Sequence, residues 1–159
     1  MRANWSRIVV GVAAGARRAL AGCLLALVGC AAPIELPPQF LVLQGDTFRA
    51  VTGDDARLWV RDFEEPNVAS LEFWGEALRY DLCEQRGYEL VGRGEVRSRG
   101  GDLGQWFEFA ANVHGQRTGY LIAFWVDGAR IRTVEFAAVD KAFRAQVDGV
   151  RAALATTSF

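Results

Sequence analysis

Histidine and cysteine are scarce in this sequence, which has one histidine and three cysteines in 159 residues. A zinc site needs several Cys or His ligands at close spacing, and a catalytic histidine needs a nucleophile and an orienting acid around it. The one histidine, His114, lies in the segment NVHGQR, which is typical of a surface turn. Neither a nucleophile-elbow motif nor a Gly-Lys-Ser/Thr phosphate loop occurs. We therefore expect that the protein is not an enzyme and has no metal or cofactor site.

The sequence also lacks an apolar run of the roughly 20 residues that a membrane-spanning helix needs. The apolar run at 19–29 is shorter, and it follows a segment, 1–18, that has four arginines and no acidic residue. A cationic flank followed by a short apolar core predicts a secretory signal peptide. We expect residues 1–29 to be removed on export.

The apolar run ends in Leu27, Val28, Gly29 and Cys30, a sequence that resembles the lipobox of bacterial lipoproteins. The resemblance implies that Cys30 becomes the first residue of the mature chain and receives a diacylglycerol and an N-acyl chain. A thiol can be alkylated to a stable thioether, and two or three acyl chains anchor a protein firmly. The alternative is an ordinary signal peptide cleaved nearby, for instance after Ala32.

Lipidation and cleavage would change both the thiols and the charge of the chain. Cys83 would remain as the one free thiol, so no intramolecular disulfide could form. The whole chain has 18 Lys+Arg and 19 Asp+Glu, and loss of four arginines leaves 14 minus 19, a net charge of −5. This acidic balance argues against nucleic acid as a partner, because nucleic-acid binding needs clustered positive charge.

The mature chain divides into a proline-rich segment, 30–39, and one domain, 40–159. Pro33, Pro37 and Pro38 favour extended backbone. We expect residues 31–39 to form a tether that lifts the domain off the lipid surface.

Six strands are predicted from β-branched and aromatic runs separated by turn residues, at 40–51, 56–63, 88–97, 105–113, 119–126 and 130–138. Two amphipathic helices are predicted, one at 68–87 after Glu64-Glu65-Pro66 and one from Asp140, as N-cap, to Leu154. In 119–126 the apolar residues occupy both alternating sets, which indicates a strand covered on both faces. We predict an α+β fold in which an antiparallel sheet of about six strands, with elements in the order ββαββββα, is covered by two helices.

This element order and the ending LATTSF at 154–159 resemble the PsbP-like fold. That fold is shared by the photosystem extrinsic protein, a Ran-binding nuclear import factor and bacterial lipoproteins of the DcrB type. The resemblance implies a six-stranded antiparallel sheet between helices over most of 40–159. It transfers no binding residue to a position in this sequence, and a fold alone does not determine a function.

Arg93, Arg97 and Arg99 cluster along one predicted strand and its turn, and Trp106 lies in the next strand. A solvated edge is the simpler interpretation of these arginines. The functional interpretation is a partner surface for an anionic lipid headgroup or cell-wall polymer, with Trp106 as the tryptophan to check for exposure. The glycines at 92 and 94 predict a strand irregularity, and those at 100–101 predict a turn.

Three functional hypotheses remain. The first is a noncatalytic lipoprotein of the cell envelope, held outside the cytoplasm, that serves as an interaction or accessory module of a membrane-associated assembly. The second is a carrier or sensor of a small apolar ligand. The third is an envelope hydrolase, which would need His114 to meet carboxylates or Cys83 in a cleft. In a Gram-negative cell, Ala31 in place of an aspartate after Cys30 favours the periplasmic face of the outer membrane.

Overall fold

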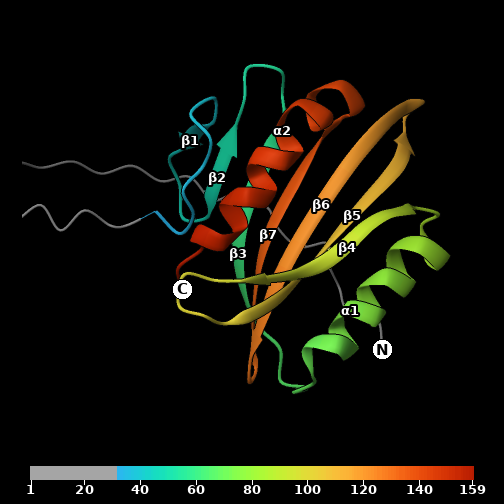
Figure 1. Cartoon of the computed structure of the whole chain (residues 1–159). Coiled ribbons are helices and arrows are strands. Elements are labelled where there is room, and N and C mark those ends of the chain that lie inside the picture. The colour runs from blue at the N-terminus through green and yellow to red at the C-terminus, as the bar shows by residue number, and fades with distance from the viewer. Residues whose placement is uncertain (1–31) are drawn as a thin grey trace, which may run out of the picture. The chain divides into compact units, whose positions relative to one another are not determined.

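The computed structural model describes residues 32–159, and the predicted signal peptide, the lipobox and Cys30 lie outside them. The described residues form one antiparallel sheet and two α-helices (Figure 1). No helix within this range combines the length and apolarity needed to cross a membrane.

The sheet has seven strands in the spatial order β1-β2-β3-β7-β6-β5-β4, and every neighbouring pair is antiparallel. The strands are β1 (Leu41–Leu43), β2 (Phe48–Val51), β3 (Arg57–Glu64), β4 (Glu89–Arg97), β5 (Leu103–Val113), β6 (Gln116–Asp127) and β7 (Arg130–Val139). The predicted α+β class and antiparallel sheet are confirmed. The predicted strand count and element order are wrong by one strand, because a bend around Gly45 and Asp46 divides the run 40–51 into β1 and β2.

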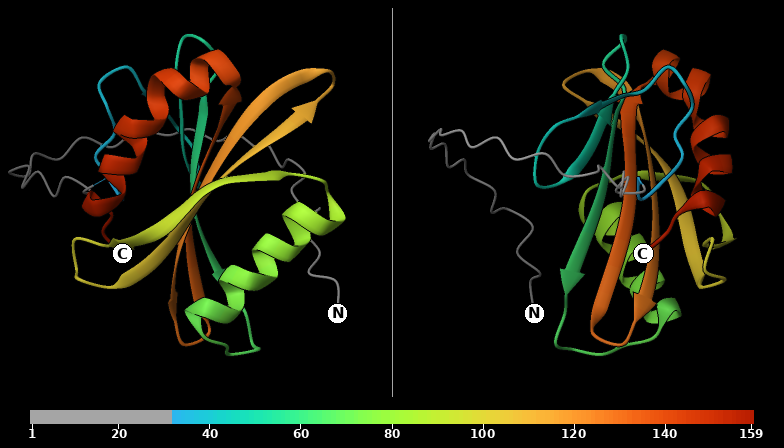
Figure 2. Two further views of the ribbon diagram at one scale, coloured as in Figure 1. Left: turned by 45° about the vertical axis from the view of Figure 1, so that its right-hand side comes forward. Right: turned by 90° about the vertical axis from the view of Figure 1, so that its left-hand side faces the viewer.

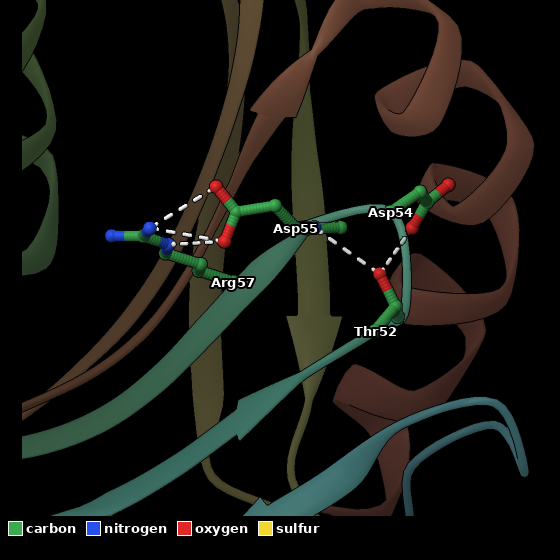
Figure 3. Close-up of polar contacts among 5 residues, drawn as sticks. Thr52, Asp54, Asp55 and Arg57 are labelled. Atoms are coloured by element: carbon green, nitrogen blue, oxygen red, sulfur yellow. Dashed lines mark hydrogen bonds and ion pairs between the residues drawn. The ribbon is translucent and has the colours of Figure 1, made fainter.

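Short turns connect the long strands, as the sequence predicts. In the turn between β2 and β3, the Thr52 hydroxyl donates to the Asp54 carboxylate and accepts from the Ala56 amide at 3.1 Å (Figure 3). The turn between β5 and β6 consists of His114 and Gly115, whose φ angles are 50° and 78°. Two residues with positive φ match the right-handed twist of a hairpin, so His114 has a role in the turn itself.

Helix α1 (Leu71–Tyr80) begins three residues later than the predicted start at Val68, which lies outside the helix with 70 % of its surface exposed. The start is set by Ser70, whose Oγ accepts from the Phe73 amide at 3.2 Å. The helix continues as a π-helical turn, η1 (Asp81–Gln85), and the chain leaves it at Gly87 with a φ of 69°.

Helix α2 (Asp140–Ala153) is followed by a 3-10 turn, η2 (Leu154–Thr156). The prediction that Asp140 is the N-cap is wrong, because Val139 occupies that position and Asp140 is the first helical residue. Its carboxylate instead pairs with Arg144, one turn later, at 2.9 Å. A carboxylate at this position also interacts favourably with the helix dipole.

The two helices cover opposite faces of the sheet, with the central strands passing between them in the left view of Figure 2. β6 supplies both cores: Leu121, Ala123 and Trp125 pack in the cluster with α2, whereas Ile122 and Phe124 pack in the cluster with α1. This confirms the prediction that the strand is covered on both faces. The sheet is therefore the middle layer of the domain.

Gly119 of β6 allows α2 to approach the sheet closely. A Cβ atom built on Gly119 would lie 2.2 Å from Cγ of Phe143, so the Phe143 ring occupies the space of a side chain. Gly75 has a similar role in α1, where a Cβ would lie 2.4 Å from Oε1 of Gln105 and 3.2 Å from Cζ of Phe107. The absence of a side chain at each glycine allows a helix to pack directly on a strand.

The described part of the predicted tether is packed on the domain. Ile34 is 1 % exposed and belongs to the core beneath α2. The Ser158 amide donates to the Pro33 carbonyl at 2.9 Å, which joins this segment to the C-terminal residues (Figure 1). Phe40 packs edge-on against Phe136, with 6.0 Å between the ring centroids. Residues 33–40 are thus part of the domain.

Candidate functional site

The predicted partner surface is divided between the two faces of the sheet. Arg93 and Arg97 lie on the face that α1 covers, since Arg93 is paired in register with Phe107. Arg93 forms an ion pair with Glu76 of α1 at 3.5 Å. Trp106 packs with the opposite core, under α2. The structure therefore places Arg93 and Arg97 on one face of the sheet and Trp106 on the other.

Trp106 is half-buried, and its packing explains the glycines of β4. A Cβ on Gly94 would lie 2.8 Å from the indole, so the ring lies directly against the backbone of β4. Arg151 of α2 covers the ring from the other side, 4.8 Å from its centroid, and forms an ion pair with Glu108. The predicted strand irregularity is confirmed as a register shift between Leu90 and Gly92.

Arg99, the fourth predicted residue, lies in the turn between β4 and β5. Its guanidinium pairs with Glu35, and its backbone amide donates to the Thr157 carbonyl at 2.8 Å. Arg99 thus links the N-terminal and C-terminal segments. Binding of a partner by Arg93, Arg97, Arg99 and Trp106 stays a prediction.

The other chemically reactive side chains stand apart from one another in their contacts. His114 is exposed in its turn and has no hydrogen bond or ion pair to any described residue. Cys83 is half-buried in η1 and packs against the core beneath α1. Within residues 32–159, no group of three or more His, Cys, Asp or Glu side chains is arranged to hold a metal ion.

A buried polar network lies on the α1 side of the sheet, centred on Glu135 of β7, which is 9 % exposed. The Tyr120 hydroxyl donates to Oε2 of Glu135 at 3.0 Å, and the Thr133 hydroxyl donates to Oε1 at 3.4 Å. Nη1 of Arg61 lies 3.5 Å from Oε1 and neutralises the carboxylate. A buried carboxylate is tolerated only when such partners compensate the loss of water.

The environment of Tyr120 favours the neutral phenol. Burial, and then the negative charge of Glu135, raise the pKa of Tyr120 well above its ordinary value. The hydroxyl therefore remains a hydrogen-bond donor to Glu135 at physiological pH. This network acts as a polar link between β3, β6 and β7.

The network borders a basic and aromatic surface, which we call the β3 face: the exposed Arg49 and Arg57, and the half-buried Trp59 and Arg61. Arg49 of β2 is paired in register with Trp59 of β3, and Arg57, Trp59 and Arg61 alternate along β3 on one side. α1 lies over β5, away from β1 and β2 in the sheet order (Figure 1). The β3 face is therefore the part of this side that extends beyond the helix.

The three arginines of the β3 face differ in their partners. Arg57 donates two hydrogen bonds to Asp55, at 3.0 and 3.1 Å (Figure 3). Arg61 is paired with Glu135, and its Cζ lies 5.7 Å from the centroid of the Trp59 ring. Arg49 is exposed and has no carboxylate within ion-pair distance among residues 32–159. Arg49 is thus a cation with no ion-pair partner in the described part of the chain, next to a tryptophan, and this arrangement suits an anionic partner with an apolar part.

Sequence reasoning missed the β3 face, although a signal for it was present. In RLWVRDF, at 57–63, Leu58 and Val60 alternate with Arg57, Trp59 and Arg61. This period of two predicts a strand with one buried and one polar face. The inclusion of Arg49 in the β3 face depends on the register between strands β2 and β3.

Comparisons with solved structures show the fold. LpqN of Mycobacterium tuberculosis, described as involved in cell envelope biogenesis, has a TM-score of 0.61 at 10 % identity over 79 % of this chain and 80 % of that chain. PA94 of Pseudomonas aeruginosa, a protein of unknown function, has a TM-score of 0.57 at 11 % identity over 76 % and 81 %. PsbP from the cyanobacterium Synechocystis has a TM-score of 0.51 at 12 % identity over 75 % and 80 %. No protein-family model and no curated protein sequence matches the chain.

These structures define the class of the domain. It is an α+β domain of PsbP-like fold, so the predicted resemblance is confirmed at the level of the fold. Identities of this size concern the fold alone, and one fold serves many functions. The function therefore has to be argued from the residues of this chain.

Proposed function

We propose that the protein is a lipid-anchored lipoprotein of the cell envelope whose domain is a noncatalytic interaction module of a membrane-associated assembly. The acyl chains would be a diacylglycerol and an N-acyl group on Cys30. The partner would be an envelope protein or an anionic surface polymer, and the β3 face would bind it. The proposed location is outside the cytoplasm, at the periplasmic face of the outer membrane in a Gram-negative cell.

The observation that carries the binding role is the pair of an exposed Arg49 and a half-buried Trp59. Arginine and tryptophan are enriched among the residues that dominate binding energy at interfaces. Arg49 is not neutralised by any carboxylate of residues 32–159, so its charge is available to a partner. The arrangement around Glu135 favours a scaffold role over catalysis, since its carboxylate is engaged by Tyr120, Thr133 and Arg61 of the same sheet.

The anchoring part of the proposal rests on the four-residue lipobox after a cationic and apolar segment. The likeness to LpqN, described as involved in cell envelope biogenesis, agrees with an envelope role. Two acyl chains would hold the protein on a membrane without a spanning helix.

Arg49→Glu tests the binding role. Affinity capture from detergent-solubilised membranes is expected to recover a component with the wild-type protein and about tenfold less of it with Arg49→Glu. Loss of a charge contact and introduction of a repulsive one should exceed the 1.4 kcal/mol that corresponds to about tenfold in affinity. The readout is the amount of that component per amount of bait, measured by quantitative mass spectrometry.

Lys141→Glu is the matched control. Lys141 is an exposed residue of α2, on the other side of the sheet, and it forms no ion pair with any described residue. The substitution should leave capture unchanged. Equal capture by both variants would contradict a role for the β3 face, and recovery of a bound lipid alone would favour the carrier hypothesis.

A further inference from the structure

The N-terminal segment is clamped at one end of the domain, immediately after the predicted lipidation site. The Ser158 amide donates to the Pro33 carbonyl at 2.9 Å, and the Glu35 amide donates to Thr156 Oγ1 at 2.9 Å. The Glu35 carboxylate pairs with Arg99 in the turn between β4 and β5. Three contacts from two other parts of the chain therefore fix the point where the N-terminal residues leave the domain.

Burial of the next side chain secures this clamp. Ile34 is 1 % exposed in the core beneath α2. A Cβ on Gly149 of α2 would lie 3.2 Å from Cγ of Pro37, so the segment follows the helix closely. Release of residues 33–37 would expose this apolar surface to water, which is unfavourable.

We infer that one end of the domain, which we call the anchor end, is held against the lipid headgroups: residues 33–36, the turn 98–102 and residues 156–159. The inference rests on the proposed lipidation of Cys30. Three peptide units separate Cys30 from Pro33, and an extended chain spans at most about 3.6 Å per residue, or about 11 Å in all. A lipid on Cys30 therefore places the anchor end at the membrane surface. A free tether, as predicted from the prolines, would instead have held the domain away from that surface.

The exposed side chains of the anchor end suit a membrane that contains anionic phospholipid. Arg97 has no carboxylate within ion-pair distance among the described residues, and its guanidinium donates to the Gly101 carbonyl at 3.0 Å. Next to it in register is Leu103, which is 38 % exposed, and Phe159 at the C-terminus is 44 % exposed. Arginine is attracted to anionic headgroups, and exposed Leu and Phe side chains gain from burial at the boundary of headgroups and acyl chains.

Fluorescence quenching in vesicles tests this orientation. The protein is purified from membranes in a Cys83→Ser background and labelled with bimane at Gly100→Cys or at Gln116→Cys. Gly100 lies in the anchor-end turn, whereas Gln116 is the exposed first residue of β6 and is paired with Val113, at the far end of β5. β5 has 11 residues. Such a strand is about 35 Å long. The vesicles contain phosphatidylethanolamine, phosphatidylglycerol and a lipid with a nitroxide on its headgroup.

The label at Gly100 is expected to be quenched severalfold more than the label at Gln116. A variant with eight Gly-Ser residues inserted after Ala32 keeps the domain and lengthens the link by roughly 15 Å. In this variant, quenching at Gly100 should fall toward the value at Gln116. Equal quenching at both positions without the spacer, or stronger quenching at Gln116, would overturn the inference.

The experiments distinguish a protein without acylation of Cys30 from an acylated protein whose domain has another orientation. Mass spectrometry of the N-terminal peptide first shows whether Cys30 is acylated, and an unmodified Cys30 would refute the proposed lipidation. The mature chain, 30–159, includes all of the described core. A lipid with a cyanobenzothiazole group can then be attached, since this group condenses with the amine and thiol of the N-terminal Cys30 and leaves the internal thiol for bimane. The same quenching comparison tests the orientation in that case.

Discussion

Gly119→Ala is expected to lower the free energy of unfolding by about 1–3 kcal/mol, the usual cost of overpacking a core. The new methyl group would overlap the Phe143 ring, with 2.2 Å to Cγ and 2.3 Å to Cδ1. Phe143 is buried between α2 and the sheet and stacks on Phe136 with 5.2 Å between centroids. Relief of the overlap therefore requires α2 or the ring to shift. Urea unfolding followed by circular dichroism measures the loss.

Gly53→Ala is the matched control, because a Cβ on Gly53 would have no atom within 4 Å. Its stability should stay within about 0.5 kcal/mol of the wild type. Phe143→Leu in the Gly119→Ala background should recover part of the loss, which a double-mutant cycle quantifies. Alanine in a strand is normally more stable than glycine, so a Gly119→Ala protein as stable as the wild type would contradict the packing described.

Ile34→Ala is expected to cost about 2–5 kcal/mol of unfolding free energy, as for other large aliphatic side chains truncated in a core. Ile34 is 1 % exposed and packs in the cluster beneath α2. A spacer free in solvent would lose almost nothing from the same change. The substitution therefore separates a docked N-terminal segment from a flexible tether, and thermal or urea unfolding measures it.

Val68→Ala is the control for this prediction, because Val68 lies in a loop with 70 % of its surface exposed. Its effect should be within about 0.5 kcal/mol. A loss at Ile34 as small as that at Val68 would mean that residues 33–40 are not part of the folded core, and would also remove the basis for the membrane orientation.

Local patterns predicted most of the secondary structure. The two-sided apolar alternation of β6 indicated a strand between two layers, and the spacing of apolar residues placed both helices. The division of 40–51 was missed because that run is apolar on both sides of Gly45 and Asp46. Nothing in its period distinguishes one long strand from two short ones.

The N-terminal segment shows why composition misled at one point. Three prolines favour extended backbone, but the segment bends at residues 33–34, turns between Pro37 and Phe40, and packs on the domain. Ile34 is the residue that decides this, and its burial depends on Thr156 and Ser158 at the other end of the chain. Contacts over such a separation are not visible in a local pattern.

The candidate site was predictable only in part. Alternation of Arg57, Trp59 and Arg61 was readable from the sequence, but their pairing with Arg49 and Glu135 follows from strand register. Of the predicted set, Trp106 lies on the face opposite Arg93 and Arg97, because it is paired with Gly94 and neighbouring residues of a strand point to opposite faces. Linear proximity in a strand therefore does not make a common surface.

Lipidation of Cys30 is the central claim, and metabolic labelling with a clickable palmitate analogue tests it most directly. The account predicts that the wild type is labelled, that Cys83→Ser is labelled equally, and that Cys30→Ser is not labelled. Cys83→Ser controls for acylation of the thiol that the structure places in η1. Equal labelling of the wild type and Cys30→Ser would contradict the claim.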